Sequence, residues 1–206
     1  VVNRSIADWY ATRYRLKPVW VVRNVPYRNE SEPVRTGLLR QAVGLGGDVQ
    51  LFLYQGLLAP GRGVELLIGA FSKLPDRHLV FMGYGELEGR IRKLAARQPN
   101  IHFLPAVPPE HVKDYTVDAD VGISLIENVC LSYYLCLPNK LFEYAACGVP
   151  AVVSDFPEMG RFVDENDCGW TVAPNAESLH RLVRSLTEAE VDAKRTKTRN
   201  FGRLYS

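Results

Sequence analysis

The residues best suited to chemistry lie at the start of one expected helix, in the stretch PNKLFEYAACGVP (138–150). Pro138 suits the first helical position, because its missing N–H would have no partner there. The preceding residue is Leu137, whose side chain cannot accept a hydrogen bond. The N–H groups of Asn139 and Lys140 therefore receive no acceptor from that position, and such a helix end is an anion site suited to a diphosphate.

Glu143 is the carboxylate of this stretch, and it lies four residues after Asn139, so both project from one face of the helix. An ionised carboxylate has two acceptor oxygens, which is enough for both hydroxyls of a ribose. A phosphate at the helix end and a ribose one turn deeper would match a nucleotide laid along the helix. The alternative is a helix that is capped from elsewhere, with Glu143 at its rim. These residues alone do not decide between the two.

A basic group, Arg62, lies in the loop QGLLAPGRG (55–63) ahead of another expected helix. A cation at the start of a helix opposes the helix dipole, so local energetics do not explain it. An anionic ligand would explain it, because the flanking glycines permit close approach and the helix end attracts the same phosphate. The alternative is an arginine exposed to solvent in a loop.

The loop GYGELEG (83–89) resembles a dinucleotide-binding fingerprint, but Glu88 occupies its third glycine position. We therefore reject a nicotinamide or flavin site. Gly83 and Gly85 are interpreted as residues of a tight strand-to-helix turn near the ligand.

Asp118 and Asp120 have the D-x-D spacing of metal-dependent transferases. They stand just before an expected strand, in a helix-to-strand connection, and not at the end of a strand where ligands bind in open sheets. The prediction is that no metal binds there.

These groups are spaced along an alternating pattern of apolar and amphipathic segments. Strands are expected at 49–54, 79–83, 101–104, 121–126, 150–154 and 170–173. Helices are expected at 63–73, 86–97, 109–116, 139–147, 158–164 and 176–187. Continuous apolar strands separated by amphipathic helices indicate an α/β fold with a doubly wound, Rossmann-like parallel sheet. The candidate residues then gather at the carboxyl ends of the strands.

The segments on either side of this pattern are different. Residues 4–15 are expected to form a helix, and 19–22 (VWVV) a strand. Residues 1–27 are interpreted as the tail of a preceding domain, and 28–48 as a linker. The final segment, 188–206, is basic and has no apolar stripe; we interpret it as a polar helix, with contact to anionic lipid as the alternative.

Composition limits the classes of protein. The 206 residues include 47% hydrophobic and 23% charged residues, as in a globular protein with a core. A net charge of +2 is too small to indicate a nucleic-acid partner. The four cysteines lack Cys-x-x-Cys spacing and are interpreted as small buried residues in a reducing compartment, with metal ligation as the alternative. The chain starts Val-Val-Asn-Arg, with neither Met nor a signal peptide, so we expect it to be cut from a longer protein.

Three stretches together resemble a known family: PNKLFEYAACGVPAVVSD, LFLYQGLLAPGRGVELLIGAF and NIHFLPAVPPEHVKDYTVDADVGISLI. They are similar to the donor-binding, C-terminal half of GT-B glycosyltransferases of the group 1, family 4-like type, from about residue 50 to 185. The resemblance implies a nucleotide-sugar-binding domain at 49–187. It also implies that 1–27 ends the acceptor-binding domain and that 188–206 begins the C-terminal crossover segment.

The resemblance also implies roles for individual residues. Glu143 matches the second glutamate of the family's Glu-x7-Glu motif, which holds the ribose, and Arg62 matches a basic residue that stabilises the leaving group. The backbone around Ala106 and Val107 would meet the edge of the base. The implied catalytic residues are Arg62 and Glu143, and the implied binding residues are Gly56, Arg62, Gly83, Gly85, Ala106, Val107, Pro138, Asn139, Lys140, Leu141 and Glu143.

Two positions depart from the family. Leu135 stands where the first glutamate of the motif is expected, so that contact to the donor sugar is missing. Leu57, after Gly56, replaces a second basic residue. Glu127 or Asn128 is a hypothetical substitute for the missing glutamate.

The resemblance implies a retaining, metal-independent hexosyltransferase of polysaccharide biosynthesis. It implies no cofactor, but a UDP- or GDP-linked sugar as co-substrate, and a glycan or lipid-linked acceptor bound by the missing half. The fragment alone would be inactive. The expected location is the cytoplasm, with peripheral contact at the inner face of the membrane in the full-length protein.

Two further function classes stay open. The first is a nucleotide-sugar-binding or regulatory module without catalysis, which Leu57 and Leu135 favour. The second is a receiver-like or protein-interacting α/β domain. We rank it last, because Gln55 and Gly56 stand where a receiver needs a phospho-acceptor aspartate.

Overall fold

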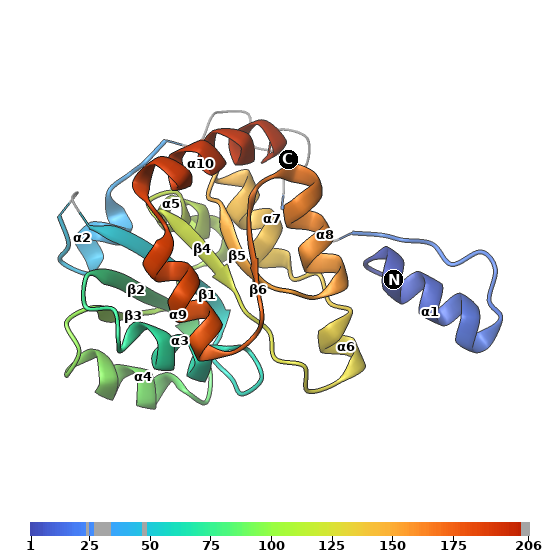
Figure 1. The fold of residues 1–206 in the computed structure, drawn as a ribbon, viewed down its shortest axis with the longest axis horizontal. Coiled ribbons are helices and arrows are strands. Elements are labelled where there is room, and N and C mark those ends of the chain that lie inside the picture. The colour runs from blue at the N-terminus through green and yellow to red at the C-terminus, as the bar shows by residue number, and fades with distance from the viewer. Residues whose placement is uncertain (24, 27–33, 47–48, 203–206) are drawn as a thin grey trace.

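Six parallel strands form one sheet in the part of the chain that the structure, a computed structural model, describes: residues 1–23, 25–26, 34–46 and 49–202 (Figure 1). The strands are β1 (Gln50–Leu57), β2 (Arg77–Tyr84), β3 (Ile101–Pro105), β4 (Val121–Ser124), β5 (Ala151–Ser154) and β6 (Gly169–Val172). Their order is β3-β2-β1-β4-β5-β6, so the direction of winding reverses between β1 and β4. This order confirms the predicted doubly wound, Rossmann-like fold.

Helices cover both faces of the sheet (Figure 1). One face carries α3 (Val64–Phe71), α4 (Glu88–Ala95) and α9 (Ala176–Ser185), and the other carries α2 (Leu38–Ala42), α5 (Val112–Thr116), α7 (Asn139–Ala146) and α8 (Pro157–Asn166). Side chains of β1 alternate between the two cores: Leu51 and Leu53 pack in one, Phe52 and Tyr54 in the other. All four are fully buried, which explains the continuous apolar runs of the strands.

The remaining elements are α1 (Arg4–Tyr14), the short 3₁₀-helix η1 (Pro109–His111), α6 (Leu131–Tyr134) and α10 (Glu188–Gly202). Of the helices in the described ranges, none combines the length and the apolar character that crossing a bilayer requires.

The chain before the sheet begins with α1, as predicted, but the strand expected at 19–22 is wrong. Residues 15–23 form neither helix nor strand. The Val22 N–H donates to the Val1 carbonyl at 2.8 Å, and the Val1 amino group donates to the Trp20 carbonyl at 3.0 Å. A strand needs a ladder of partners along its length, and a single facing residue does not supply one.

Part of the expected linker, residues 34–46, instead docks on the domain; residues 28–33 and 47–48 lie outside the described residues. The Asp118 carboxylate accepts hydrogen bonds from the N–H groups of Thr36, Gly37 and Leu39, at 2.8, 2.8 and 2.9 Å. Leu39 is fully buried in the core. A carboxylate about 80 residues later in the chain thus caps α2, which no local sequence signal reveals.

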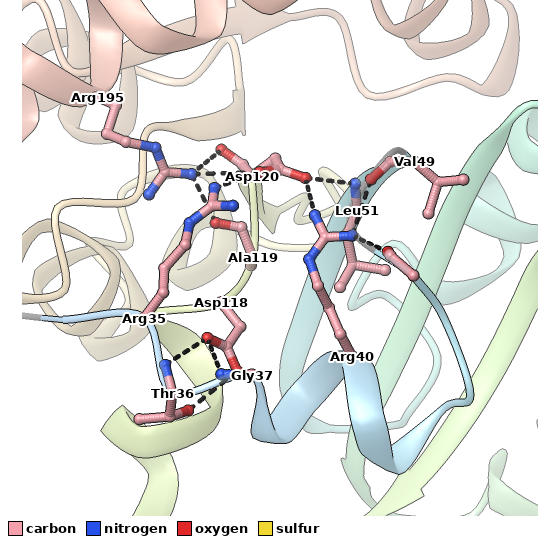
Figure 2. A network of polar contacts seen from close by, with 11 residues as sticks. Arg35, Thr36, Gly37, Arg40, Val49, Leu51, Asp118, Ala119, Asp120 and Arg195 are labelled. Carbon is pink, nitrogen blue, oxygen red and sulfur yellow. Dashed lines mark hydrogen bonds and ion pairs between the residues drawn. The ribbon is translucent and has the colours of Figure 1, made fainter.

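Asp120 joins three parts of the chain at the amino end of the sheet (Figure 2). Its Oδ1 accepts from Arg35 at 2.5 Å, and its Oδ2 accepts from Arg40 at 2.7 Å and from the Leu51 N–H at 2.8 Å. The guanidinium of Arg195, from α10, lies 3.6 Å from Oδ1. Burial, and then Arg35, lower the pKa of Arg195 to about 10. One carboxylate therefore balances three guanidinium groups.

The helix α10 lies along α7 and α8 (Figure 1). Its buried positions are Val191, Arg195 and Thr198, which share one helical face. Two of the three are polar, and for this reason hydrophobic periodicity does not reveal the face.

We predict that Asp120→Asn lowers the free energy of unfolding by about 3 kcal/mol, because Arg195 is then buried without a counter-charge. Urea denaturation followed by circular dichroism measures the change. The matched control is Asp167→Asn, which removes an exposed carboxylate paired with Lys194 and Lys197 and should cost less than about 1 kcal/mol. Equal losses in the two variants would contradict the central position given to Asp120.

Candidate functional site

A cavity of about 590 Å³ opens at the carboxyl ends of β1 and β2, next to the start of α7. Its lining residues are Gln55, Gly56, Arg62, Met82, Gly83, Tyr84, Ala106, Val107, Pro109, Val112, Pro138, Asn139, Lys140 and Glu143. The structure therefore brings together, around one cavity, all the site residues singled out from the sequence except Gly85 and Leu141. The cavity lies beside the point where the strand order reverses, which is where open parallel sheets bind ligands.

Gly85 and Leu141 have other roles. Gly85 has φ +145°, and a Cβ there would lie 2.4 Å from the Leu58 carbonyl oxygen, so the tight turn itself requires glycine. Leu141 is 1% exposed, because it lies on the face of α7 that packs in the core. Neither residue lines the cavity, and the tight turn at Gly85 is the one expected from the sequence.

The start of α7 has no side-chain cap, as expected, and the helix begins at Asn139 as predicted, but Pro138 does not occupy its first helical position. Pro138 is the N-cap residue, with extended backbone angles (φ −66°, ψ 142°), and Asn139 is the first helical residue. Leu137 is therefore one position outside the cap. A proline at the N-cap leaves the first turn without a side-chain acceptor in the same way, so this end of α7 still suits an anion.

Arg62 lies over the ring of Tyr133, with its guanidinium carbon 4.5 Å from the ring centroid. Its Nε is buried without a hydrogen-bond partner, and no carboxylate among the described residues forms an ion pair with it. Gly63, the N-cap of α3, has φ +76°, and a Cβ there would lie 2.7 Å from the Leu125 carbonyl oxygen. The glycine thus sets the path of the loop that presents Arg62. Tyr133, the platform under the guanidinium, was missed from the sequence.

The side chain of Lys140 extends from α7 to the end of β1. Its Nζ lies 3.8 Å from the centroid of the Tyr54 ring, and a Cβ on Gly56 would lie 3.8 Å from the same atom. Burial, followed by the nearby Arg62, lowers the pKa of Lys140 to about 7, and Glu143 partly opposes this shift. Only the backbone N–H of Lys140 was expected at the site, because the sequence gives no direction for the side chain.

Glu143 is held by a chain of two hydrogen bonds. Its Oε2 accepts from Gln55 Nε2 at 2.5 Å, and Gln55 Oε1 accepts from the Thr116 hydroxyl at 2.8 Å. Gln55 and Thr116 are both buried, so the carboxylate that lines the cavity has a fixed orientation. Gln55 and Thr116 were also missed, because 61 residues separate them in the chain.

Leu57 and Leu135, the two departures from the family pattern, both lie outside the set of residues that line the cavity. Leu57, at the end of β1, is 41% exposed. The Leu135 carbonyl accepts from the Asn3 side chain at 2.7 Å. Neither Glu127 nor Asn128 lines the cavity, and Glu127 accepts from the Gly63 N–H at 3.3 Å. The hypothesis that one of them substitutes for a glutamate at Leu135 gains nothing from this arrangement.

Solved structures share this fold. WaaG, a glycosyltransferase involved in lipopolysaccharide biosynthesis, matches with a TM-score of 0.75 and 19% identity, over 100% of this chain and 59% of that chain. HepE from Anabaena, solved in complex with UDP and glucose, matches with a TM-score of 0.67 and 16% identity, over 85% of this chain and 49% of that chain. At these identities the likeness concerns the fold.

Curated relatives match in sequence. An uncharacterized glycosyltransferase of Methanocaldococcus jannaschii, MJ1607, is 27% identical over 147 residues, which are 68% of this chain and 36% of the relative. The putative colanic acid biosynthesis glycosyl transferase WcaI of Escherichia coli K12 is 26% identical over 157 residues, which are 73% of this chain and 38% of the relative. The chain thus spans just over a third of the length of these relatives.

The sequence pattern of the family described as "Glycosyl transferases group 1" matches residues 37–204, most of the chain. With this match, and with the six-stranded sheet that it shares with GT-B enzymes such as WaaG, the chain belongs to the group 1 glycosyltransferases.

Proposed function

We propose that the cavity binds the nucleoside diphosphate part of a sugar donor, and that the chain is the donor-binding part of a glycosyltransferase. The observation that carries the proposal is the arrangement of three groups around one cavity. These are the uncapped start of α7, the guanidinium of Arg62, which has no ion-pair partner among the residues that the structure describes, and the oriented carboxylate of Glu143.

Each group has a task in this proposal. The N–H groups of Asn139 and Lys140 and the Arg62 guanidinium bind the diphosphate and stabilise the charge that develops on it as the sugar departs. The Glu143 carboxylate accepts hydrogen bonds from the ribose hydroxyls, while Gln55 prevents it from rotating. The backbone at Ala106 and Val107, on the cavity wall, contacts the base.

We also propose a UDP- or GDP-linked hexose as donor, with retention at the anomeric carbon. The likeness to HepE, a protein solved with UDP and glucose, favours the uridine nucleotide. Metal independence is supported by the carboxylates of the D-x-D pair, since Asp118 is bonded to backbone N–H groups and Asp120 to arginines. The chain would need its acceptor-binding half for activity.

The proposed acceptor is a glycan or a lipid-linked glycan, in line with the naming of WcaI for colanic acid biosynthesis. The proposed location is the cytoplasm, at the inner face of the membrane. Contact with anionic lipid would use basic groups other than Lys194 and Lys197, because both already pair with Asp167.

A second candidate function is a nucleotide-sugar-binding module without catalysis. The observation that favours it is the exposed Leu57 at the end of β1, where the family has a basic residue. Sugar transfer by the full-length protein, with the hydrolysis of UDP-glucose as a background control, separates an enzyme from such a module.

Calorimetric titration with UDP, GDP, ADP and inorganic pyrophosphate tests the donor site. We expect one nucleoside diphosphate to bind preferentially. Arg62→Ala should lower the affinity for both that nucleotide and pyrophosphate by about tenfold or more, which is the effect of losing one hydrogen bond to a charged group. Glu143→Ala should lower the affinity for the nucleotide to a similar extent. It should leave the affinity for pyrophosphate unchanged, since pyrophosphate has no ribose.

The control for this titration is Arg90→Ala, which removes an arginine paired with Glu65 on the surface, outside the cavity, and should change nothing. Failure of the folded protein to bind any of the three nucleotides would overturn the proposed function. So would equal binding by wild type, Arg62→Ala and Glu143→Ala.

Gln55→Leu should lower the affinity for the nucleoside diphosphate by about three- to tenfold, because the Glu143 carboxylate loses the hydrogen-bond donor that orients it. Pyrophosphate affinity should stay unchanged. Thermal unfolding shows whether the variant is folded, since Thr116 also loses its acceptor at Gln55. Unchanged nucleotide affinity in a folded variant would show that Gln55 does not orient Glu143 for binding and has only a structural role.

A further inference from the structure

The cavity has an unexplained second cation. Leu57 stands where the family pattern has a basic residue, and its apolar side chain cannot bind a phosphate. A positive charge from another residue nevertheless lies near the preceding residue, Gly56. Apart from the chain neighbours of Gly56, the atoms found within 4 Å of a Cβ placed on that glycine are Cε and Nζ of Lys140. The ammonium therefore lies beside the end of β1, although its backbone belongs to α7.

The environment of this ammonium contains an aromatic ring and a like charge. Nζ lies 3.8 Å from the centroid of the Tyr54 ring, which is fixed because the Tyr54 hydroxyl donates to the Leu57 carbonyl at 2.7 Å. A cation over an aromatic ring is attracted by the ring quadrupole but keeps its charge. No carboxylate among the described residues forms an ion pair with Lys140.

Two cations in one cavity repel each other, and an anion bound between them offsets this repulsion. Arg62 and Lys140 both line the cavity, and the repulsion between them is one cause of the lowered pKa of Lys140. A singly charged ligand would balance one of them. A diphosphate carries at least two negative charges and spans two phosphates, so it suits a pair of cations at a helix end.

We propose that the Lys140 ammonium is the second cation of this site, and that it binds the diphosphate from the β1 side in place of the basic residue lost at Leu57. The inference rests on the proposed function, because it assumes that the cavity receives a nucleoside diphosphate. It goes further in giving a side chain of α7 the task that a loop residue has elsewhere in the family.

The pH dependence of binding separates this role from a structural one. Since the pKa of Lys140 is about 7 in the free protein, part of the population must take up a proton when an anion binds. Affinity should therefore fall as the pH rises from 7 to 9. Burial raises the pKa of Tyr54 above its ordinary value and that of Cys136 to about 11, so neither titrates in this range. The other charged groups that act on this ammonium are Arg62 and Glu143.

The experiment is calorimetric titration with UDP at pH 7 and pH 9, in buffers of different ionisation enthalpy, which report proton uptake. Wild type should take up a fraction of a proton at pH 7 and bind about tenfold more weakly at pH 9. Lys140→Met, of similar length without charge, should bind about tenfold more weakly at pH 7 and show less proton uptake and a smaller loss of affinity at pH 9 than wild type. Lys140→Arg should retain binding at pH 9, since arginine keeps its proton.

The control is Lys93→Met, which removes an exposed lysine of α4 and should behave as wild type. Wild-type affinity, proton uptake and pH dependence in a folded Lys140→Met would overturn the role of Lys140 and leave the proposed function standing. If the folded wild-type protein binds no nucleoside diphosphate at all, both proposals fall together.

Discussion

Burial of β1 on both faces is the constraint on which the rest of the structure depends. A strand in the middle of a parallel sheet that is covered by helices on both sides has no exposed side chain along most of its length. Polar chemistry can therefore emerge only where the strand ends, at Gln55 and Gly56. The strand order reverses beside this point, so the starts of α3 and α7 face the same opening. The cavity follows from this packing.

The two ends of the sheet handle charge in opposite ways. At the amino ends of the strands, three arginines share the carboxylate of Asp120 and several backbone carbonyls, so their charge is largely balanced within the protein. At the carboxyl ends, Arg62 and Lys140 have aromatic rings beneath them, and neither forms an ion pair with a carboxylate in the described part of the chain. An aromatic ring holds a cation in place without cancelling its charge. The first arrangement stabilises the fold, and the second leaves charge available to a ligand.

The sequence was sufficient for the sheet and for the location of the cavity, because both depend on short-range patterns. Apolar runs mark buried strands, and a proline at an uncapped helix end marks the start of α7. It was insufficient wherever the partner is distant in the chain. The capping of α2 by Asp118 and the alignment of Gln55 between Thr116 and Glu143 join residues that are 61 to 88 positions apart. The direction of the Lys140 side chain depends on space that only packing creates.

The Asp120 cluster ties together the two segments by which the chain enters and leaves the sheet. Arg35 and Arg40 belong to the entering segment, and Arg195 belongs to α10 at the exit. In evolutionary terms, none of these four positions is free to change alone. Loss of the acid leaves three guanidinium groups that repel one another. Loss of one base changes the net charge around the acid and the two remaining bases. Positions 35, 40, 120 and 195 should therefore co-vary as a set among homologues, independently of whatever nucleotide or sugar each homologue uses.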